Sequence, residues 1–289
     1  MGYVSERFHI YGDKQMAIEA PFPELDELLT LIGEAGHRLS EIEASEGAAG
    51  NISVYIGWPV DPRRKFPLAE TIQLPVPVPE LAKGAFLVTG SGRRLREIIK
   101  DPSANLGFVV IDEGGQTGCL YTSPRRLFAR LTSEFNSHLA VHRDQVSTSK
   151  TNFHAVMHAQ PPHLTYLSHV PRYQDEVYLN RHILRWQPEL IVQLPEGVGC
   201  ISFTVPGSNE LMQATVETLR SHRIVIWGKH GVVARSDTSV KNASDRIEYA
   251  ETGAKYEYMN LTNGELGEGL SDAEIQAICQ AFGVKQNVF

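Results

Sequence analysis

Four residues suited to metal chemistry lie in one short stretch of the chain, 153–163. His154, His158 and His163 occur there together with Gln160. Imidazole is the commonest protein ligand for metal ions near neutral pH. This clustering of imidazoles beside an amide therefore favours a metal site.

The surrounding residues predict how these side chains are held. The mostly apolar segment 153–157 should form a buried strand, and Pro161-Pro162 suits the first turn of a helix, where no backbone donor is needed. His154 and His163 could instead be ordinary polar residues at the ends of these elements. We therefore regard His158 as the strongest candidate ligand.

A further histidine lies far along the chain. His230 follows a predicted buried strand at 223–227 and sits between two nearby glycines. A side chain in a glycine-rich turn can project freely. A lone histidine in this position would usually be structural, but paired with His158 it would complete a metal site.

Two glycine-containing turns are candidates for binding an anion. Ser91 and Gly92 lie between a predicted strand and a predicted helix, where the backbone can approach a ligand and a helix start offers free donors. Asn51 follows Gly50 at the start of another predicted strand and offers an amide group. A phosphate site is one interpretation, and an ordinary turn is the alternative for both segments.

Two hydroxyls and a carboxylate come together at Thr132, Ser133 and Glu134. One interpretation is N-capping of the helix that follows, with an acidic residue favourably placed in its first turn. The other is a ligand-binding pair beside a general base. The residue types alone leave both open.

The remaining chain alternates between strand and helix patterns, which predicts a single α/β domain with a mixed, largely antiparallel sheet flanked by helices. We assign 1–20 to an N-terminal arm and 21–289 to this domain. We expect strands at 51–57, 85–88, 106–111, 119–122, 153–157, 197–203, 223–227 and 230–234, with extended chain at 71–79 after a loop at 58–69. We expect helices at 25–42, 174–187 and 238–262, and others starting near 92, 132, 206 and 271.

Composition excludes several classes of protein. The 289 residues are 42% hydrophobic and 21% charged, which is typical of a globular chain. A net charge of -7 without a basic run argues against nucleic-acid binding. Three widely spaced cysteines form no CxxC pair, and no apolar run reaches the length of a membrane span. We therefore expect a cytoplasmic protein without a membrane partner.

Several motifs of this chain, taken together, resemble the class II aldolase/adducin family. They are Gly-Asn-Ile-Ser at 50–53, Val-Thr-Gly-Ser-Gly at 88–92, Thr-Ser-Glu-Phe at 132–135, Met-His-Ala-Gln at 157–160 and Lys-His-Gly at 229–231. Further segments fit an aldolase of this family in order and spacing: 101–107, 195–199, 246–251 and 281–284. The resemblance extends over roughly residues 25–285.

The resemblance implies a site and an assembly. The family's zinc ligands fall on His158, Gln160 and His230, and its catalytic carboxylate falls on Glu134. Zn²⁺ is accordingly the expected metal, with Mn²⁺ or Co²⁺ as alternatives. The family's assembly is a cyclic homotetramer with active sites at subunit interfaces. Its phosphate contacts fall on Asn51, Ser91, Gly92 and Ser133, to which we add Thr132 as a candidate substrate contact.

Three positions depart from the family pattern. Gln160 replaces a histidine ligand, and an amide oxygen is a weaker zinc ligand than imidazole. We considered His163 or Glu134 as compensating ligands. Ala48 stands where a related aldolase has an asparagine, and Arg185 stands near a position that is acidic in that aldolase.

Three functions are compatible with these residues. The first is a metal-dependent lyase that cleaves a small phosphorylated ketose. The second is an epimerase or dehydratase that uses the same site. The third is a non-catalytic binding protein of the adducin type, which loss of one histidine ligand would suit.

Overall fold

A nine-stranded sheet organises the computed structural model, which describes residues 17–289. The strand order is β2-β5-β4-β3-β1-β6-β9-β8-β7. Neighbouring strands are antiparallel, except that β7 and β8 are parallel. The predicted mixed, largely antiparallel sheet is therefore confirmed. The strands are β1 Asn51–Ile56, β2 Leu68–Gln73, β3 Ala85–Thr89, β4 Leu106–Ile111, β5 Thr117–Thr122, β6 Phe153–Ala159, β7 Gly199–Ile201, β8 Ile224–Trp227 and β9 Gly231–Ser236.

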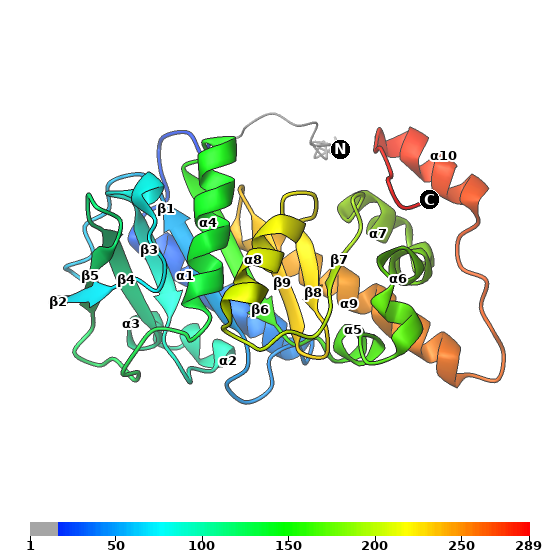
Figure 1. Cartoon of the computed structure of the whole chain (residues 1–289), viewed down its shortest axis with the longest axis horizontal. Coiled ribbons are helices and arrows are strands. Elements are labelled where there is room, and N and C mark those ends of the chain that lie inside the picture. The colour runs from blue at the N-terminus through cyan, green and yellow to red at the C-terminus, as the bar shows by residue number, and fades with distance from the viewer. Residues whose placement is uncertain (1–16) are drawn as a thin grey trace, which may run out of the picture.

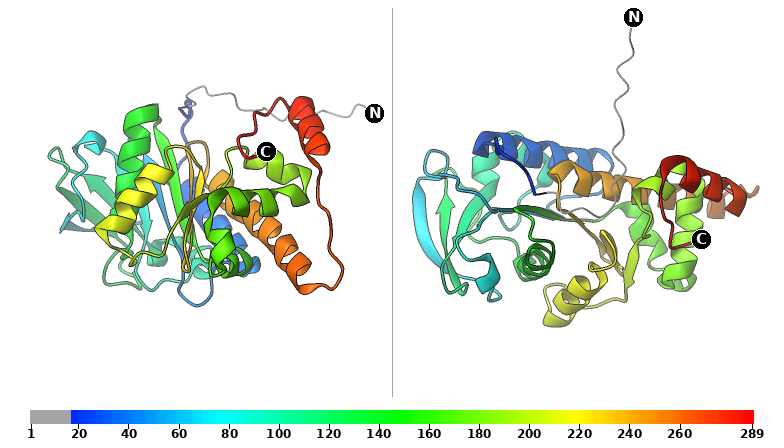
Figure 2. Two further views of the ribbon diagram at one scale, coloured as in Figure 1. Left: turned by 45° about the vertical axis from the view of Figure 1, so that its right-hand side comes forward. Right: turned by 90° about the horizontal axis from the view of Figure 1, so that it is seen from above.

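Helices cover both faces of this sheet (Figure 1). Seen from above, α1 and α9 lie on one face, and α4 and α8 lie on the other (Figure 2). The α-helices are α1 Leu25–Glu41, α2 Leu95–Ile98, α3 Pro102–Asn105, α4 Phe135–Ser149, α5 Pro162–Leu167, α6 Glu176–Ile183, α7 Pro188–Gln193, α8 Asn209–Thr218, α9 Val240–Thr262 and α10 Asp272–Phe282. The 3₁₀ helices are η1 Pro79–Leu81, η2 Pro171–Gln174 and η3 Leu184–Trp186.

The two faces of the central strands differ in polarity. Successive side chains of a strand point to opposite faces, so Ile52 and Val54 of β1 join the large core beneath α1 and α9. The alternate residues of β1 include Asn51 and Ser53, whose side chains contact residues of α4 and the turn before it. A polar strip of β1 therefore faces α4.

Several predicted elements are confirmed, and four need correction. The strands predicted at 106–111 and 119–122 are present as β4 and β5, and the helix predicted to start near 271 begins at Asp272, after a capping box at Ser271. The helix predicted at 174–187 ends at Ile183 and continues as η3. The strand predicted at 197–203 is only Gly199–Ile201, and β2 begins within the predicted loop at 58–69. The helix predicted to start near 132 begins at Phe135, because Glu134 occupies the N-cap.

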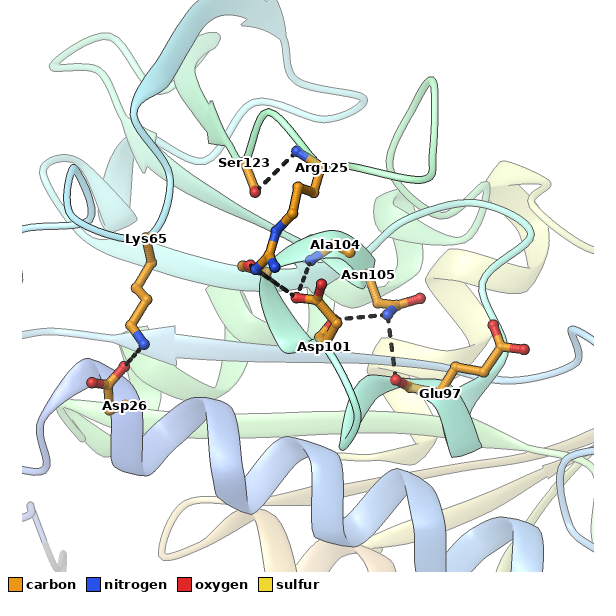
Figure 3. Close-up of polar contacts among 9 residues, drawn as sticks. Asp26, Lys65, Glu97, Asp101, Ala104, Asn105, Ser123 and Arg125 are labelled. Atoms are coloured by element: carbon orange, nitrogen blue, oxygen red, sulfur yellow. Dashed lines mark hydrogen bonds and ion pairs between the residues drawn. The ribbon is translucent and has the colours of Figure 1, made fainter.

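Polar contacts brace the segment that follows the glycine-rich turn at 89–92 (Figure 3). The Asp101 carboxylate accepts a hydrogen bond from the Ala104 N–H (3.3 Å) and another from Arg125 (3.3 Å). The Asn105 amide donates to the carbonyl oxygens of Asp101 (2.8 Å) and Glu97 (3.4 Å). These bonds fix α2 and α3, and with them the turn that the sequence predicts to bind an anion.

The predicted arm at 1–20 falls mostly outside the described residues, so its boundary with the domain at 21–289 stays a prediction. At the edge of the described chain, the Ile18 N–H donates to the Asn152 side chain (2.8 Å). None of the helices formed by residues 17–289 combines the length and apolar character needed to cross a bilayer.

Candidate active site

Three side chains from distant parts of the chain converge at one edge of the sheet. Glu134 lies at the N-cap of α4, His158 lies near the end of β6, and His230 lies in the turn between β8 and β9. One ligand atom from each lies within 4.8 Å of the other two. The Nε2 atoms of His158 and His230 are each 3.7 Å from a carboxylate oxygen of Glu134.

The backbone of β9 orients the imidazole of His158. The His158 Nδ1 lies 2.9 Å from the Val232 carbonyl oxygen, which can only accept, so Nδ1 carries a proton and Nε2 is the nitrogen that faces Glu134. Gly231 makes this approach possible, since a Cβ there would lie 2.4 Å from the Ala159 oxygen. The rings of His158 and His230 both stack on Trp227, with centroids 4.9 and 5.4 Å away.

Glu134 is a buried carboxylate surrounded by histidines and an amide. Burial by itself would raise its pKa, but the neighbouring His158 and a hydrogen bond from the Asn51 amide (2.6 Å) outweigh this effect and lower the pKa below its ordinary value. Burial lowers the pKa of His230, and the adjacent His158 lowers it further. The site therefore holds an ionised carboxylate beside a neutral imidazole at neutral pH.

This donor set fits a divalent metal. Two imidazoles and a carboxylate are ligands that several divalent transition metals accept. The Nδ1 atom of His230 is buried and has no hydrogen-bond partner among residues 17–289. Gln160 lines the same pocket, and its side chain makes no hydrogen bond to the described residues, although its backbone N–H donates to Ala44 (2.8 Å). The Gln160 amide is thus available as a further ligand.

The structure brings every predicted site residue to the wall of one pocket: Asn51, Ser91, Gly92, Thr132, Ser133, Glu134, His158, Gln160 and His230. Their individual roles stay predictions. Ala48, the position that departs from a related aldolase, also lines this pocket.

One end of the pocket is suited to an anion. The hydroxyls of Ser91 and Ser133 and the Gly92 N–H make no hydrogen bond within the described part of the chain, so they are free to donate to a ligand. Gly92 has φ 72°, a conformation that favours glycine. The predicted contribution from a helix start needs correction, because α2 spans only Leu95–Ile98 and has a correspondingly small dipole.

Sequence reasoning missed Arg93, which also lines the pocket. Its guanidinium is held by Glu97 (2.8 Å) and Asn105 (2.8 Å), and its side chain is only 17% exposed. It is the first cation after the predicted anion-binding turn, and that adjacency is the signal that could have identified it. A fixed cation at this end strengthens the case for a phosphate.

Three other candidates lie outside the site. His163 does not compensate for the missing ligand, because its Nδ1 is 2.6 Å from the Glu251 carboxylate, which also accepts from its backbone N–H (3.0 Å). His154 is fully buried and contacts His142 instead. Arg185 lies on η3, with its guanidinium 5.1 Å from the Trp186 ring centroid.

Comparison with known proteins gives a consistent result. Residues 30–258 match the family model described as Class II Aldolase and Adducin N-terminal domain. The chain is 32% identical over 213 residues to a rhamnulose-1-phosphate aldolase from Enterobacter sp. (strain 638), covering 74% of this chain and 76% of that protein. It is also 32% identical over 218 residues to a rhamnulose-1-phosphate aldolase from Escherichia coli O157:H7, covering 75% and 78% of the two chains.

Solved structures support the same fold. A sugar-phosphate aldolase from Thermotoga maritima superposes with a TM-score of 0.69 at 26% identity, covering 84% of this chain and 98% of that one. An L-fuculose 1-phosphate aldolase gives a TM-score of 0.55 at 19% identity, covering 90% and 98%. At that identity the second similarity concerns the fold alone.

Proposed function

Because this chain belongs to the class II aldolase and adducin family and is an aldehyde-lyase, we propose that it cleaves a ketose 1-phosphate. L-rhamnulose 1-phosphate is the proposed example, with dihydroxyacetone phosphate and L-lactaldehyde as products. The observation that carries this proposal is the convergence of Glu134, His158 and His230 beside a set of unpaired anion donors.

The chemistry divides between the two ends of the pocket. His158, Gln160 and His230 would hold a divalent ion, with the Glu134 carboxylate beside them. The resemblance implies zinc, with manganese or cobalt as alternatives. Such an ion supplies Lewis-acid polarisation of a carbonyl when bound. Ser91, Gly92, Ser133 and Arg93 would bind the phosphate and so fix which carbon–carbon bond faces Glu134.

Glu134 is the proposed proton carrier. Its ionised carboxylate accepts the proton of the C4 hydroxyl while the C3–C4 bond breaks and C4 becomes the aldehyde carbon. The electrons of the broken bond form an enediolate across C2 and C3. C3 then takes up one proton, which balances the proton lost from the C4 hydroxyl and gives dihydroxyacetone phosphate. In the reverse direction the protonated Glu134 returns that proton. The Asn51 amide, which donates to Glu134 (2.6 Å), holds the carboxylate in place.

The alternatives predict different products from the same site. An epimerase would interconvert sugar phosphates without releasing dihydroxyacetone phosphate. An adducin-type protein would neither cleave nor epimerise a sugar phosphate. The buried, ionised Glu134 supports an enzyme. We further propose that the protein is a homotetramer located in the cytoplasm.

A substrate screen tests the proposal. Ketose 1-phosphates are incubated with the purified protein loaded separately with zinc, manganese or cobalt, and released dihydroxyacetone phosphate is measured. We expect release from L-rhamnulose 1-phosphate, and none from the unphosphorylated ketose at the same concentration. Epimerised sugar phosphate without cleavage would replace the lyase proposal with the epimerase.

Gln160→His is expected to raise zinc affinity by about tenfold or more, because an imidazole nitrogen replaces a neutral amide oxygen. Competition with a chromophoric chelator measures this affinity independently of activity. Gln276→His, on the exposed face of α10, is the control and should leave zinc affinity unchanged. Equal affinities for the Gln160 variant and the parent protein would show that this side chain does not face the metal.

A further inference from the structure

The interface between α4 and the sheet contains a buried polar strip of which the proposed reaction uses only one member, Glu134. Glu134, His138 and His142 recur every fourth residue and therefore share one face of the helix. His138 and His142 are both 0% exposed. Helix faces packed on a sheet are normally apolar, and burying imidazoles without good partners costs free energy. A strip of this composition next to a catalytic carboxylate requires an explanation.

Each histidine of the strip is bonded to the sheet. The Ser53 hydroxyl lies 2.7 Å from His138 Nδ1 and 2.7 Å from His142 Nε2. The His142 Nδ1 lies 2.8 Å from the Nδ1 of His154 on β6. Asn51, two residues before Ser53 on the same face of β1, bonds to Glu134 in the same way. We call Ser53, His138, His142 and His154 the histidine chain.

The number of available protons restricts the direction in which the hydrogen bonds of the histidine chain can run. A hydroxyl has one proton, so Ser53 donates to one imidazole nitrogen and accepts from the other. Burial lowers the pKa of His138 to about 3 and lowers the pKa values of His142 and His154 well below their ordinary range, so each ring is neutral and carries one N–H. Only two arrangements remain. Either every donor in the chain points toward the His138 end, or every donor points toward the His154 end.

The charges at the two ends favour the same order. The Nε2 atoms of His138 and His154 are buried without partners among the described residues, so each order leaves an N–H at one end and a lone pair at the other. The negative Glu134 lies near the His138 end and favours an N–H there. The positive Arg235 and Arg246 lie near the His154 end and favour a lone pair there.

We propose that the histidine chain is ordered with all its donors pointing toward His138, so that aligned N–H and O–H dipoles stabilise the ionised Glu134. In this order His154 Nδ1–H donates to His142, His142 Nε2–H donates to Ser53, and the Ser53 hydroxyl donates to His138 Nδ1. Aligned hydrogen bonds polarise one another, so the effect exceeds that of any single bond. Ser53 and His138 are then positioning residues for Glu134, an inference that rests on the proposed role of this carboxylate.

Neutron diffraction from crystals of the deuterated protein tests the order directly. We expect deuterons on Nε2 of His138, Nε2 of His142 and Nδ1 of His154. A deuteron on Nδ1 of His138 would overturn the proposal. Because this measurement uses the unmodified protein and no substrate, it is decisive even if the proposed cleavage reaction is not found.

Kinetics of Ser53→Ala test the consequence for catalysis. This variant interrupts the histidine chain at its centre, so we expect kcat to fall about tenfold while KM and bound metal stay unchanged. Val156→Ala is the matched control, because Val156 pairs with Ser53 across β1 and β6 and is equally buried. It should lower the melting temperature without lowering kcat.

A positioning role also predicts partial rescue. His138→Asn keeps a polar atom near the place of Nδ1 and should retain a higher kcat than His138→Leu. Equal kcat values for the Ser53→Ala variant and the parent protein, or equal losses in Ser53→Ala and Val156→Ala, would show that the histidine chain serves packing alone. If Ser53→Ala does not fold, the comparison of the two His138 variants and the neutron measurement decide.

Discussion

The Glu134→Gln variant is expected to turn over a ketose 1-phosphate about 10³-fold more slowly than the parent protein. The glutamine amide cannot accept the hydroxyl proton, so the step assigned to Glu134 loses its base. Glutamine has nearly the same size, and it can still meet the Asn51 amide through its carbonyl oxygen. The fold should therefore persist, and we expect kcat to fall while KM changes little.

The measurement pairs steady-state kinetics with metal analysis of the same samples, because Glu134 lies within 4.8 Å of the proposed ligands His158 and His230. Glu97→Gln is a useful control, since Glu97 is an acidic residue that pairs with Arg93 at the other end of the pocket. It should change KM more than kcat. Near-normal kcat for Glu134→Gln at full metal loading would exclude this residue as the proton carrier.

Local patterns predicted much of the fold and of the site. Leucine and isoleucine at helical spacing identified α1, because one apolar face of a helix must be buried. The strand before His158 was likewise predicted, and it runs to Ala159. The pairing of His158 with His230 was one interpretation of the residues, whereas the placing of Glu134 beside them relied on the resemblance to a known family, because residues so far apart in the chain show no local sign of contact.

Contacts between segments that are far apart in the chain could not be predicted from the sequence. His163 was a plausible ligand by spacing, yet its partner is Glu251 on α9, 88 residues away. His138 and His142 have no visible partner in the sequence, because Ser53 and His154 meet them only after β1 and β6 pair beneath α4. Arg93 was overlooked since its neighbours Glu97 and Asn105 orient it only in the folded chain.

The buried histidines also predict that acid destabilises the protein strongly. Burial keeps His138, His142 and His154 neutral in the folded state, with pKa values below the ordinary 6.5. In the unfolded chain the same side chains titrate near that ordinary value. Below it the unfolded state binds more protons, so stability is fully present above about pH 6.5 and falls as the pH drops toward the folded-state values.

The expected size of this effect follows from the three groups together. Each histidine that stays neutral in the folded state lowers the free energy of unfolding at pH 5 by about 2 kcal/mol relative to pH 8. The three together lower it by about 6 kcal/mol. Since domains are typically stable by about 5–15 kcal/mol, a loss of this size brings the protein close to unfolding. Urea unfolding of metal-free protein, followed by circular dichroism at pH 8, 6 and 5, measures it without a contribution from metal ligands.

Two variants separate protonation from ordinary loss of packing. His154→Leu removes one of the three titrating groups, so the fall in unfolding free energy between pH 8 and pH 5 should shrink by about a third. Val156→Ala should lower stability equally at every pH, because it removes apolar contact and no titratable group. A fall of less than about 2 kcal/mol in the parent protein would mean that most of these imidazoles accept protons while folded.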